Sequence, residues 1–456
     1  MSCSRAMSLR ALLSVLLLLI GGCSVSRAYL GEPVQRVKSS EGYRRTVMLA
    51  ERPRDDLLVI VSLSGGGMRA SAMAYGLLEQ LAADRLPQRQ TTSRMIDQID
   101  VLSAVSGGAI PAAYYTLYGD RLFEDFIPRF LGRDVGAALR RDVLLKPRNW
   151  LRLASSEYSR GDLYADFFDQ QLFNGATFGD LDSRPDRPFL VIQATDIALA
   201  GRFEFTQDGF DPLCLDLSRY PLARAVAASS SVPAVLAPIT LRSNAGQCGY
   251  VLPAWVDTAL GNGDHSTRTH FRASIAKARS DASRIAYLHL VDGALSDNLG
   301  ARVTLDILSD EPAVFASALA PTRRPRVVYI ALNAGDPQIM RIGARRKAPD
   351  ALEMLRLMGT VPVDRYSAES KTLLREALEN WSRQQGAELY YIELEIESLR
   401  ENPQFAYLVE LPTSLVIDQK DALRLRCATR EMLHYSADYR RLLEDLGATR
   451  GGITGC

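Results

Sequence analysis

The sequence contains little histidine and has no excess of either charge. It has four histidines in 456 residues, and 54 Lys and Arg side chains oppose 53 Asp and Glu side chains, for a net charge of +1. A balanced charge argues against nucleic-acid binding, which depends on many contacts from Lys and Arg to phosphates. With 32 glycines and 21 prolines, the chain is neither collagen-like nor of low complexity.

The sequence also lacks an apolar run of the roughly 18–20 residues that a helix needs to cross a bilayer. Residues 11–20 are apolar, follow Arg5 and Arg10, and precede two glycines and Cys23. This order resembles the signal peptide and lipobox of a bacterial lipoprotein, and an uncleaved anchor is the alternative. We therefore expect a signal peptide over residues 1–22 and lipidation of Cys23, with acyl chains such as palmitate. The expected location is the bacterial cell envelope, at the outer membrane and facing the periplasm.

The cysteines are not spaced as metal ligands, because neither CxxC nor a Cys/His pattern of zinc sites occurs. We expect no metal. Signal cleavage would leave four cysteines besides Cys23 in an oxidising compartment, which suggests two disulfides. Proximity in the chain favours Cys214–Cys248 and Cys427–Cys456, while other pairings and free thiols stay open.

Short apolar runs alternate with amphipathic stretches from Leu57 onward, a pattern typical of α/β proteins. We expect a polar tether over residues 23–54 and one large hydrolase domain over residues 55–456, with a C-terminal helical extension. The polar stretch 261–284 predicts a surface loop. Strands are expected over residues 57–63, 99–105, 189–194, 287–291, 327–332 and 389–396.

Two glycine-rich segments follow the first two expected strands. Gly65, Gly66 and Gly67 precede Arg69 at a strand-to-helix turn, where backbone N–H groups can bind a phosphate or form an oxyanion hole. The second segment, Ser103 to Gly108, matches G-x-S-x-G around Ser106 except that Ala104 replaces the first glycine. Ser103 fits the pattern less well, and an ordinary Ser-Gly-Gly turn is the alternative.

A nucleophilic serine needs a base, and no histidine is an evident candidate. His265 and His270 lie in the expected loop, His289 lies in an expected buried strand, and His434 lies in a charged helical region. Asp292, followed by Gly293 at the end of a strand, is another candidate base, although most Asp-Gly pairs are turns.

The ordered set of motifs resembles the patatin-like phospholipase family over about residues 57–335. GGGxR, SxSGG and DGA occur in the family's order, with Ala294 in place of a frequent glycine. Four further segments agree with the family's bacterial members, namely residues 159–163, 172–178, 193–196 and 225–233, and LSDNLG at 295–300 continues the match.

The resemblance implies a three-layer α/β/α fold with a central, mostly parallel sheet and a nucleophile-elbow serine. It implies a Ser–Asp dyad of Ser106 and Asp292 without histidine, and an oxyanion hole of Gly65, Gly66 and Gly67 with Arg69. It also implies a lipid acyl hydrolase of the phospholipase A or lysophospholipase type, with no cofactor. The expected partners are a phospholipid or other lipid ester and the membrane, with no nucleic acid.

Two other functions stay open, a Ser–His–Asp esterase and a non-catalytic lipid-binding envelope lipoprotein. The esterase would use His434 or His289 as its base. Residues 137–153 mix Leu, Val and Trp150 with five basic side chains. We favour a connecting helix with one solvated face here, and the alternatives are a lid or a membrane-surface segment.

Overall fold

A computed structural model of the protein describes eleven stretches of the chain. Cys23, the expected signal peptide and His265 lie outside them. The described residues are 29–52, 56–89, 92–154, 158–184, 186–233, 236–261, 267–320, 324–335, 346, 348–414 and 416–456.

A central sheet organises this part of the chain. Its path is β12-β11-β2-β5-β6-β10-β9, and β7 pairs with β6 beside that path. The first five strands run parallel, whereas β10 runs antiparallel to both β6 and β9. The strands are β2 (Leu57–Leu63), β5 (Ile99–Val105), β6 (Phe189–Asp196), β7 (Gly201–Glu204), β9 (Ile239–Arg242), β10 (Tyr287–Asp292), β11 (Arg326–Asn333) and β12 (Glu388–Glu395).

The central strands are apolar along their whole length because helices cover both faces of the sheet. Every residue of β2 and of β6 is buried, as is nearly every residue of β5 and β11. Such continuous apolar runs are typical of parallel strands that are buried on both faces.

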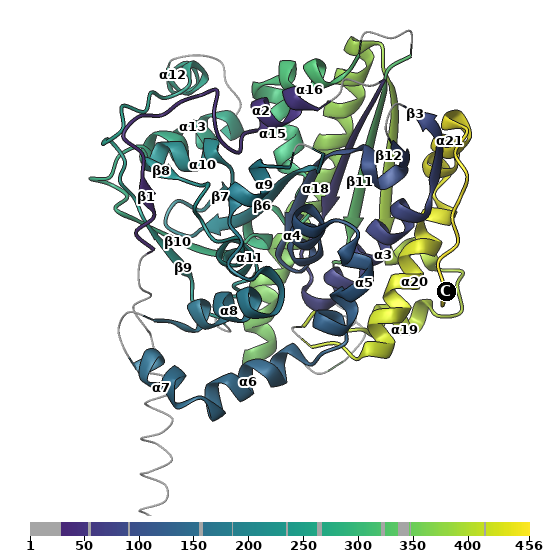
Figure 1. The fold of residues 1–456 in the computed structure, drawn as a ribbon, viewed down its shortest axis with the longest axis horizontal. Coiled ribbons are helices and arrows are strands. Elements are labelled where there is room, and N and C mark those ends of the chain that lie inside the picture. The colour runs from purple at the N-terminus through teal and green to yellow at the C-terminus, as the bar shows by residue number, and fades with distance from the viewer. Residues whose placement is uncertain are drawn as a thin grey trace, which may run out of the picture.

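Helices form the two outer layers. In Figure 1, α3 (Gly67–Ala83), α4 (Ala109–Tyr118) and α20 (Gln419–Tyr435) lie on one face of the sheet, and α18 (Ala351–Gln385) lies on the other. This arrangement confirms the expected three-layer α/β/α fold. The other helices named below are α2 (Arg45–Glu51), α6 (Val135–Leu145), α7 (Pro147–Ala154), α8 (Arg160–Phe168), α11 (Leu222–Ser229), α12 (Ala254–Leu260), α13 (Thr267–Arg279), α14 (Ala294–Asp297) and α15 (Arg302–Asp310).

The remaining elements are short and connect the layers. They are α5 (Arg121–Phe126), α9 (Phe178–Asp182), α10 (Gln207–Phe210), α16 (Pro312–Ala318), α19 (Phe405–Glu410) and α21 (Ala437–Leu446), the single turns η1 (Met95–Gln98), η2 (Ser106–Gly108), η3 (Ile127–Leu131), η4 (Asp169–Phe173), η5 (Asp211–Leu213) and η6 (Ile396–Leu399), and the paired strands β1 (Glu32–Pro33) with β8 (Leu215–Asp216) and β3 (Arg85–Arg89) with β4 (Thr92–Arg94).

The N-terminal segment differs from the tether expected over residues 23–54. From Tyr29 to Arg52 the chain packs on the domain, and Tyr43 is buried with its hydroxyl accepting the Leu190 N–H at 2.7 Å. Arg44 is also buried and forms ion pairs with Asp208 at 2.9 Å and Asp211 at 2.6 Å. Tyr43 and Arg44 therefore attach this part of the chain to the domain.

The stretch expected as a surface loop over residues 261–284 contains the helix α13. It packs on α12 around a small cluster of Val256, Ala259 and Ala273. Because alanine is the only apolar residue that this helix buries there, the apolar periodicity was too weak to indicate a helix.

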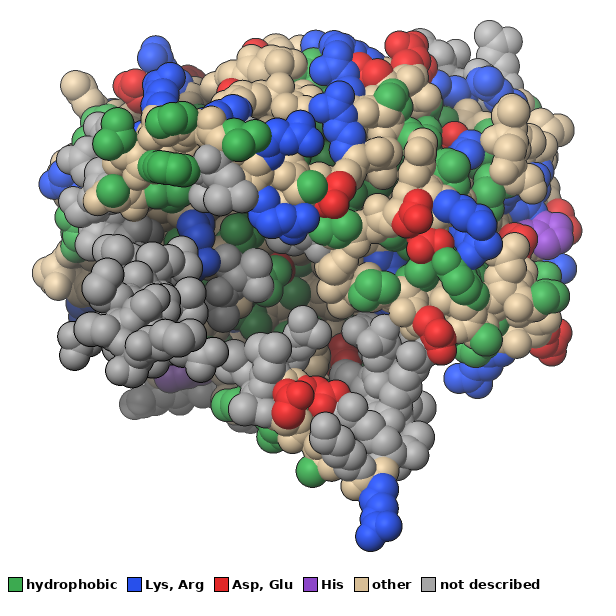
Figure 2. Space-filling view, turned by 90° about the horizontal axis from the view of Figure 1, so that it is seen from below, with side chains coloured by type: hydrophobic (Ala, Val, Ile, Leu, Met, Phe, Trp, Pro, Cys, Tyr) green, Lys and Arg blue, Asp and Glu red, His purple; other side chains and the backbone are tan. Residues whose placement is uncertain are grey.

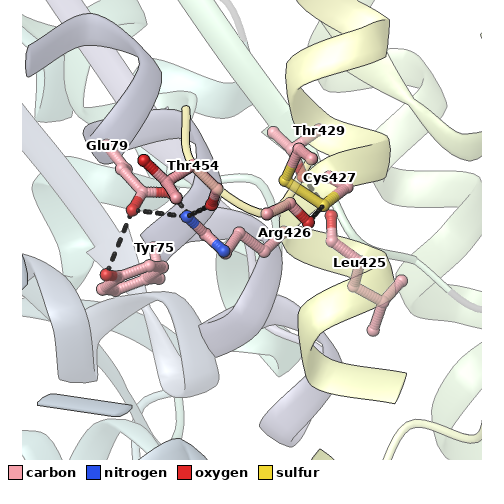
Figure 3. Close-up of a disulfide and its surroundings, with 9 residues drawn as sticks. Tyr75, Glu79, Leu425, Arg426, Cys427, Thr429 and Thr454 are labelled. Carbon is pink, nitrogen blue, oxygen red and sulfur yellow. Dashed lines mark hydrogen bonds and ion pairs between the residues drawn. A yellow bond between two sulfur atoms is a disulfide. The ribbon is translucent and has the colours of Figure 1, made fainter. Parts of the chain in front are cut away.

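The structure contains the disulfides Cys214–Cys248 and Cys427–Cys456, the two pairings that proximity favours. The second joins α20 to the end of the chain (Figure 3). Beside it, Arg426 bonds Glu79 of α3 at 2.9 Å and the Thr454 carbonyl at 3.0 Å. The C-terminal tail is thus part of the outer helical layer. Among the described residues, no helix has the length and apolar character needed to cross a membrane.

Candidate active site

Ser106 lies at a sharp turn between a strand and a helix. β5 ends at Val105, a single turn spans Ser106–Gly108, and α4 begins at Ala109. Ser106 is buried and has a φ of 49°, a left-handed conformation that costs energy for a residue with a side chain. The turn has the geometry of a nucleophile elbow.

The two glycines after Ser106 are required by close packing. A Cβ atom on Gly107 would lie 1.9 Å from the carbonyl oxygen of Gly67, and one on Gly108 would lie 2.6 Å from that of Ser64. The turn is therefore pressed against the glycine loop that follows β2. Ala104 has no such restriction, because it is an ordinary buried strand residue outside the turn.

Asp292 is the side-chain partner of Ser106. Its Oδ2 accepts the Ser106 hydroxyl at 2.8 Å, and its Oδ1 accepts the Ala294 N–H at 2.9 Å. The main chain is held as well, because the Asp292 N–H donates to the Ser231 carbonyl at 3.0 Å and Thr195 Oγ1 donates to the Asp292 carbonyl at 2.8 Å. The carboxylate therefore has one defined orientation, with one oxygen directed at the serine.

Burial changes the acidity of this carboxyl group. Removal from water raises the pKa of Asp292 to about 6, against the opposing effect of the hydrogen bonds from Ala294 and Ser106. Asp292 is thus a stronger base than an ordinary aspartate and is still ionised at neutral pH. A base with a pKa near the working pH is suited to proton transfer.

The glycine loop supplies two free N–H groups beside the serine. The Gly65 N–H donates to the Asn298 carbonyl at 2.9 Å, and the Met68 N–H donates to the Ser414 carbonyl at 2.8 Å. Between them, within the described part of the chain, the N–H groups of Gly66 and Gly67 have no hydrogen-bond acceptor. Both glycines have positive φ, 136° and 57°. Of the three glycines expected to form an oxyanion hole, Gly66 and Gly67 are the two whose N–H groups are available.

Arg69 fixes the position of this loop through hydrogen bonds to the backbone. Its buried guanidinium donates to the Ala334 carbonyl at 2.6 and 3.2 Å and to the Leu411 carbonyl at 3.1 Å. It thereby ties the first turn of α3 to the segments after β11 and before α20. Arg69 therefore lies next to the candidate oxyanion hole and holds the backbone of the glycine loop in position.

None of the three histidines in the described residues contacts Ser106 or Asp292. His289 is exposed, not buried as expected, because β10 buries only alternate residues before its end, and its Nδ1 lies 3.1 Å from Thr240 Oγ1. His434 is exposed and contacts Arg450, and His270 lies on the exposed side of α13. Since side chains alternate along a strand, His289 and Asp292 also point to opposite faces of the sheet.

Several positioning residues were not singled out from the sequence. Ser229 Oγ accepts the Ser106 N–H at 2.8 Å, and Asn298 holds Gly65 through its carbonyl. Thr195 fixes Asp292, as described above. All three lie inside segments already matched to the family, but their roles are contacts between distant segments. No property of the residues themselves indicates those contacts.

Ser103 is excluded as the nucleophile by its surroundings. It is buried, donates to the Gly300 carbonyl at 2.8 Å and accepts from Gln193 Nε2 at 2.7 Å. The described residues contain no group of three or more His, Cys, Asp or Glu side chains arranged to hold a metal ion.

The solved structures to which this chain is similar include those of human GIVD cytosolic phospholipase A2. Three of its structures show 12–13% sequence identity and TM-scores of 0.40–0.42, two of them in complex with methyl gamma-linolenyl fluorophosphonate. They align with 88–91% of this chain, which spans only 61–68% of theirs. Likeness at this level concerns the fold alone. No curated protein matches the sequence.

The sequence profile of patatin-like phospholipases matches residues 61–305, more than half of the 456-residue chain. This range begins in β2, before the glycine loop, and ends in α15, after Asp292. It therefore includes the elbow, the glycine loop and the aspartate. The chain belongs to the patatin-like phospholipase family, whose members are lipid acyl hydrolases.

Proposed function

We propose that this protein hydrolyses carboxylic esters of lipids through a dyad of Ser106 and Asp292. The observation that carries the proposal is the 2.8 Å hydrogen bond from Ser106 Oγ to Asp292 Oδ2 at a strained turn. The carboxylate takes the hydroxyl proton while Oγ attacks the acyl carbonyl carbon. The negative charge that develops on the carbonyl oxygen is stabilised by the N–H groups of Gly66 and Gly67.

Collapse of this intermediate breaks the ester bond and leaves the acyl group on Ser106 Oγ. The leaving alcohol takes the proton held by Asp292. A water molecule then attacks the acyl carbon while Asp292 accepts a proton from it. The bond from the acyl carbon to Ser106 Oγ breaks, Asp292 returns the proton to Oγ, and the fatty acid is released. The phospholipase A or lysophospholipase type of substrate is part of the proposal.

Labelling with a fluorophosphonate probe tests the nucleophile. We expect the folded wild-type protein and a Ser230→Ala variant to be labelled and Ser106→Ala to remain unlabelled. Ser230 is a matched control because it is buried beside the site and its hydroxyl has no hydrogen-bond partner among the described residues. Absence of labelling in the wild type would favour a non-catalytic lipid-binding lipoprotein. Loss of ester hydrolysis in His434→Gln or His289→Gln, with full activity in Asp292→Asn, would favour a Ser–His–Asp esterase.

We further propose that Cys23 carries the lipid that holds the protein in the bacterial envelope, at the outer membrane facing the periplasm. The disulfides Cys214–Cys248 and Cys427–Cys456 support an oxidising compartment. Metabolic labelling with palmitate, followed by fractionation, tests this. Cys23→Ser should lose both the label and membrane retention, and retention of both would contradict the anchor.

A further inference from the structure

The helices α6 and α7 form a hairpin, residues 135–154, whose surface is apolar and basic. Leu145, Trp150 and Leu151 have exposed fractions of 71%, 54% and 76%. The same stretch carries five cationic side chains, Arg140, Arg141, Lys146, Arg148 and Arg152, against one acidic residue, Asp142, and Arg140 forms an ion pair with Asp134 at 3.9 Å. The sequence favours a buried connecting helix with one solvated face here, whereas the structure has two helices, the second beginning at Pro147, with large apolar side chains exposed. Exposed Trp and Leu beside Lys and Arg are typical of a helix at a membrane interface.

A cavity of about 610 Å³ lies between the hairpin and α8. Its lining combines cations with apolar side chains. Among its described lining residues Asp166 is the one carboxylate, paired with Arg152 at 2.7 Å and accepting the Tyr158 hydroxyl at 2.6 Å. The described lining thus carries three cations, Lys146, Arg148 and Arg152, against one carboxylate, next to apolar surface, a combination that complements an anionic lipid head group. The other lining residues include Leu145, Leu163 and Phe167.

The hairpin begins beside the candidate active site. A Cβ atom on Gly136 of α6 would lie 2.7 Å from Val416 Cγ2. Two residues earlier, the Ser414 carbonyl accepts the Met68 N–H, which directly follows the glycine loop. Figure 1 draws α6 and α7 together at one end of the molecule, and Figure 2 views the molecule from that end and shows a hollow with hydrophobic side chains in it.

The first described residue lies at the same end. The ring of Tyr29 packs under the Arg224 guanidinium at 5.3 Å, and Arg224 pairs with Asp162 in the first turn of α8 at 2.8 Å. Tyr29 lies six positions after Cys23, and a fully extended chain spans at most about 20 Å over that length. If Cys23 is acylated, as the proposed function has it, the membrane surface lies within that distance of Tyr29.

We propose that the α6–α7 hairpin is a docking surface for an anionic phospholipid bilayer, the membrane that holds the lipid anchor. Trp150 and Leu151 enter the interface, and Lys146 and Arg148 contact head-group phosphates. The full chain has a net charge of +1, and cleavage before Cys23 would remove Arg5 and Arg10 and leave −1. The overall charge therefore does not hold the molecule on an anionic surface, and the local cluster supplies the attraction. Docking here places α6, which begins beside the segment that contacts the glycine loop, at the lipid surface.

Tryptophan fluorescence directly tests which end of the protein contacts the bilayer. The chain has three tryptophans, Trp150, Trp255 and Trp381, so variants with a single tryptophan are simple to make. The full-length lipoprotein is reconstituted in vesicles of phosphatidylcholine and phosphatidylglycerol that contain brominated acyl chains. We expect strong quenching of Trp150 and little quenching of Trp255, which lies in α12 at the opposite end of the molecule (Figure 1). Equal quenching of the two residues on vesicles that retain the protein would overturn the proposal.

Charge dependence tests the partner. Quenching of Trp150 should increase when phosphatidylglycerol is added to phosphatidylcholine vesicles, and Arg148→Gln should weaken this increase. The control Arg284→Gln removes another exposed arginine, outside the hairpin, and should leave the increase unchanged. An increase that is the same in all three proteins would contradict the contact with anionic lipid.

Comparing hydrolysis of vesicle phospholipid with hydrolysis of a soluble ester distinguishes failure of the docking surface from failure of the proposed function. Leu151→Glu should reduce hydrolysis of vesicle phospholipid by about tenfold or more and leave hydrolysis of a soluble short-chain ester unchanged. Val251→Glu is the matched control, since Val251 is 82% exposed on the loop before α12. A wild-type protein without any esterase activity would contradict the proposed function, and the quenching result would still decide the docking surface. Equal phospholipid hydrolysis by the two variants would contradict docking through the hairpin.

Discussion

The carboxylate of Asp292 lies 2.8 Å from the hydroxyl of Ser106, although the two residues are 186 positions apart in the chain. The registers in which β5 and β10 pair with β6 bring the two residues together. Val105, the last residue of β5, pairs with Gln193 of β6, and Asp292 pairs with Ala194, the next residue of the same strand. The strand β6 thus sets the position of both groups, and the hydrogen bonds from Thr195 and Ser229 hold them there.

Replacing Asp292 with asparagine should remove most of the activity. The amide cannot take the serine proton, and loss of a general base typically costs about 10²–10⁴ in rate. The measurement is kcat on a soluble short-chain ester, with the melting temperature as a check on folding. Ser230→Ala, the matched control from the same site, should keep the wild-type rate. An Asp292→Asn enzyme of wild-type activity would contradict the dyad.

The activity should follow the ionisation of Asp292. Only the carboxylate form accepts the serine proton, and burial raises the pKa of Asp292 to about 6. We expect kcat/KM to rise with pH through about 6, to level off above it, and to fall tenfold per pH unit well below it. A profile that is flat from pH 5 to pH 8 would show that another group acts as the base.

Asp292→Asn should also raise the stability of the protein at neutral pH. The folded-state pKa of Asp292 is raised, so ionisation destabilises the fold as the pH rises from about 4 to about 6. A neutral isostere removes this cost, a gain of up to about 3 kcal/mol in the free energy of unfolding at pH 7. Denaturant unfolding should show that the gap between variant and wild type closes below about pH 4, and a gap independent of pH would contradict this account.

Gly66→Ala should reduce kcat by displacing an oxyanion donor. A Cβ atom there would lie 2.8 Å from the Ala334 carbonyl oxygen, and the φ of 136° is unfavourable for alanine. Loss of one such donor costs about 10²–10³ in rate in other acyl-transfer enzymes. Gly246→Ala is the matched control, since Gly246 also has a positive φ but no atom within 4 Å of the added Cβ. Equal kcat values in the two variants would argue against a role for Gly66.

Arg44→Ala should destabilise the whole domain. It leaves Asp211 buried without its cation, and breaking a buried pair in this way costs about 3–5 kcal/mol. Lys38→Ala breaks an exposed pair with Glu41 and should cost no more than about 1 kcal/mol. Denaturant unfolding of both variants measures the difference, and equal stability would mean that residues 29–52 contribute little to the fold.

The α/β class and the positions of the main strands could be predicted because buried parallel strands are continuous apolar runs. The strand expected over residues 57–63 is β2, and the one expected over 99–105 is β5. The helices α2 and α13 were missed for different reasons. The helix α2 buries Met48 and Leu49 but has only seven residues, too few to show a clear apolar period. The helix α13 buries a single alanine as its apolar contact, which produces no apolar periodicity.

Local patterns indicated Ser106 and the glycine loop as candidates, because a nucleophile elbow and a glycine loop require small residues at set spacings within a few positions. The resemblance to the patatin-like family then selected Asp292 as the base. The contacts of those groups depend on long-range packing. Asp292 was expected at the end of a strand in a mostly parallel sheet. That strand, β10, runs antiparallel to β6, and Asp292 meets Ser106 because of where β10 pairs along β6. Which of the glycine N–H groups is free depends likewise on Asn298 and Ser414, which lie more than 230 residues farther along the chain. Strand register and distant hydrogen bonds arise from the packing of the whole domain, so no local pattern of residues encodes them.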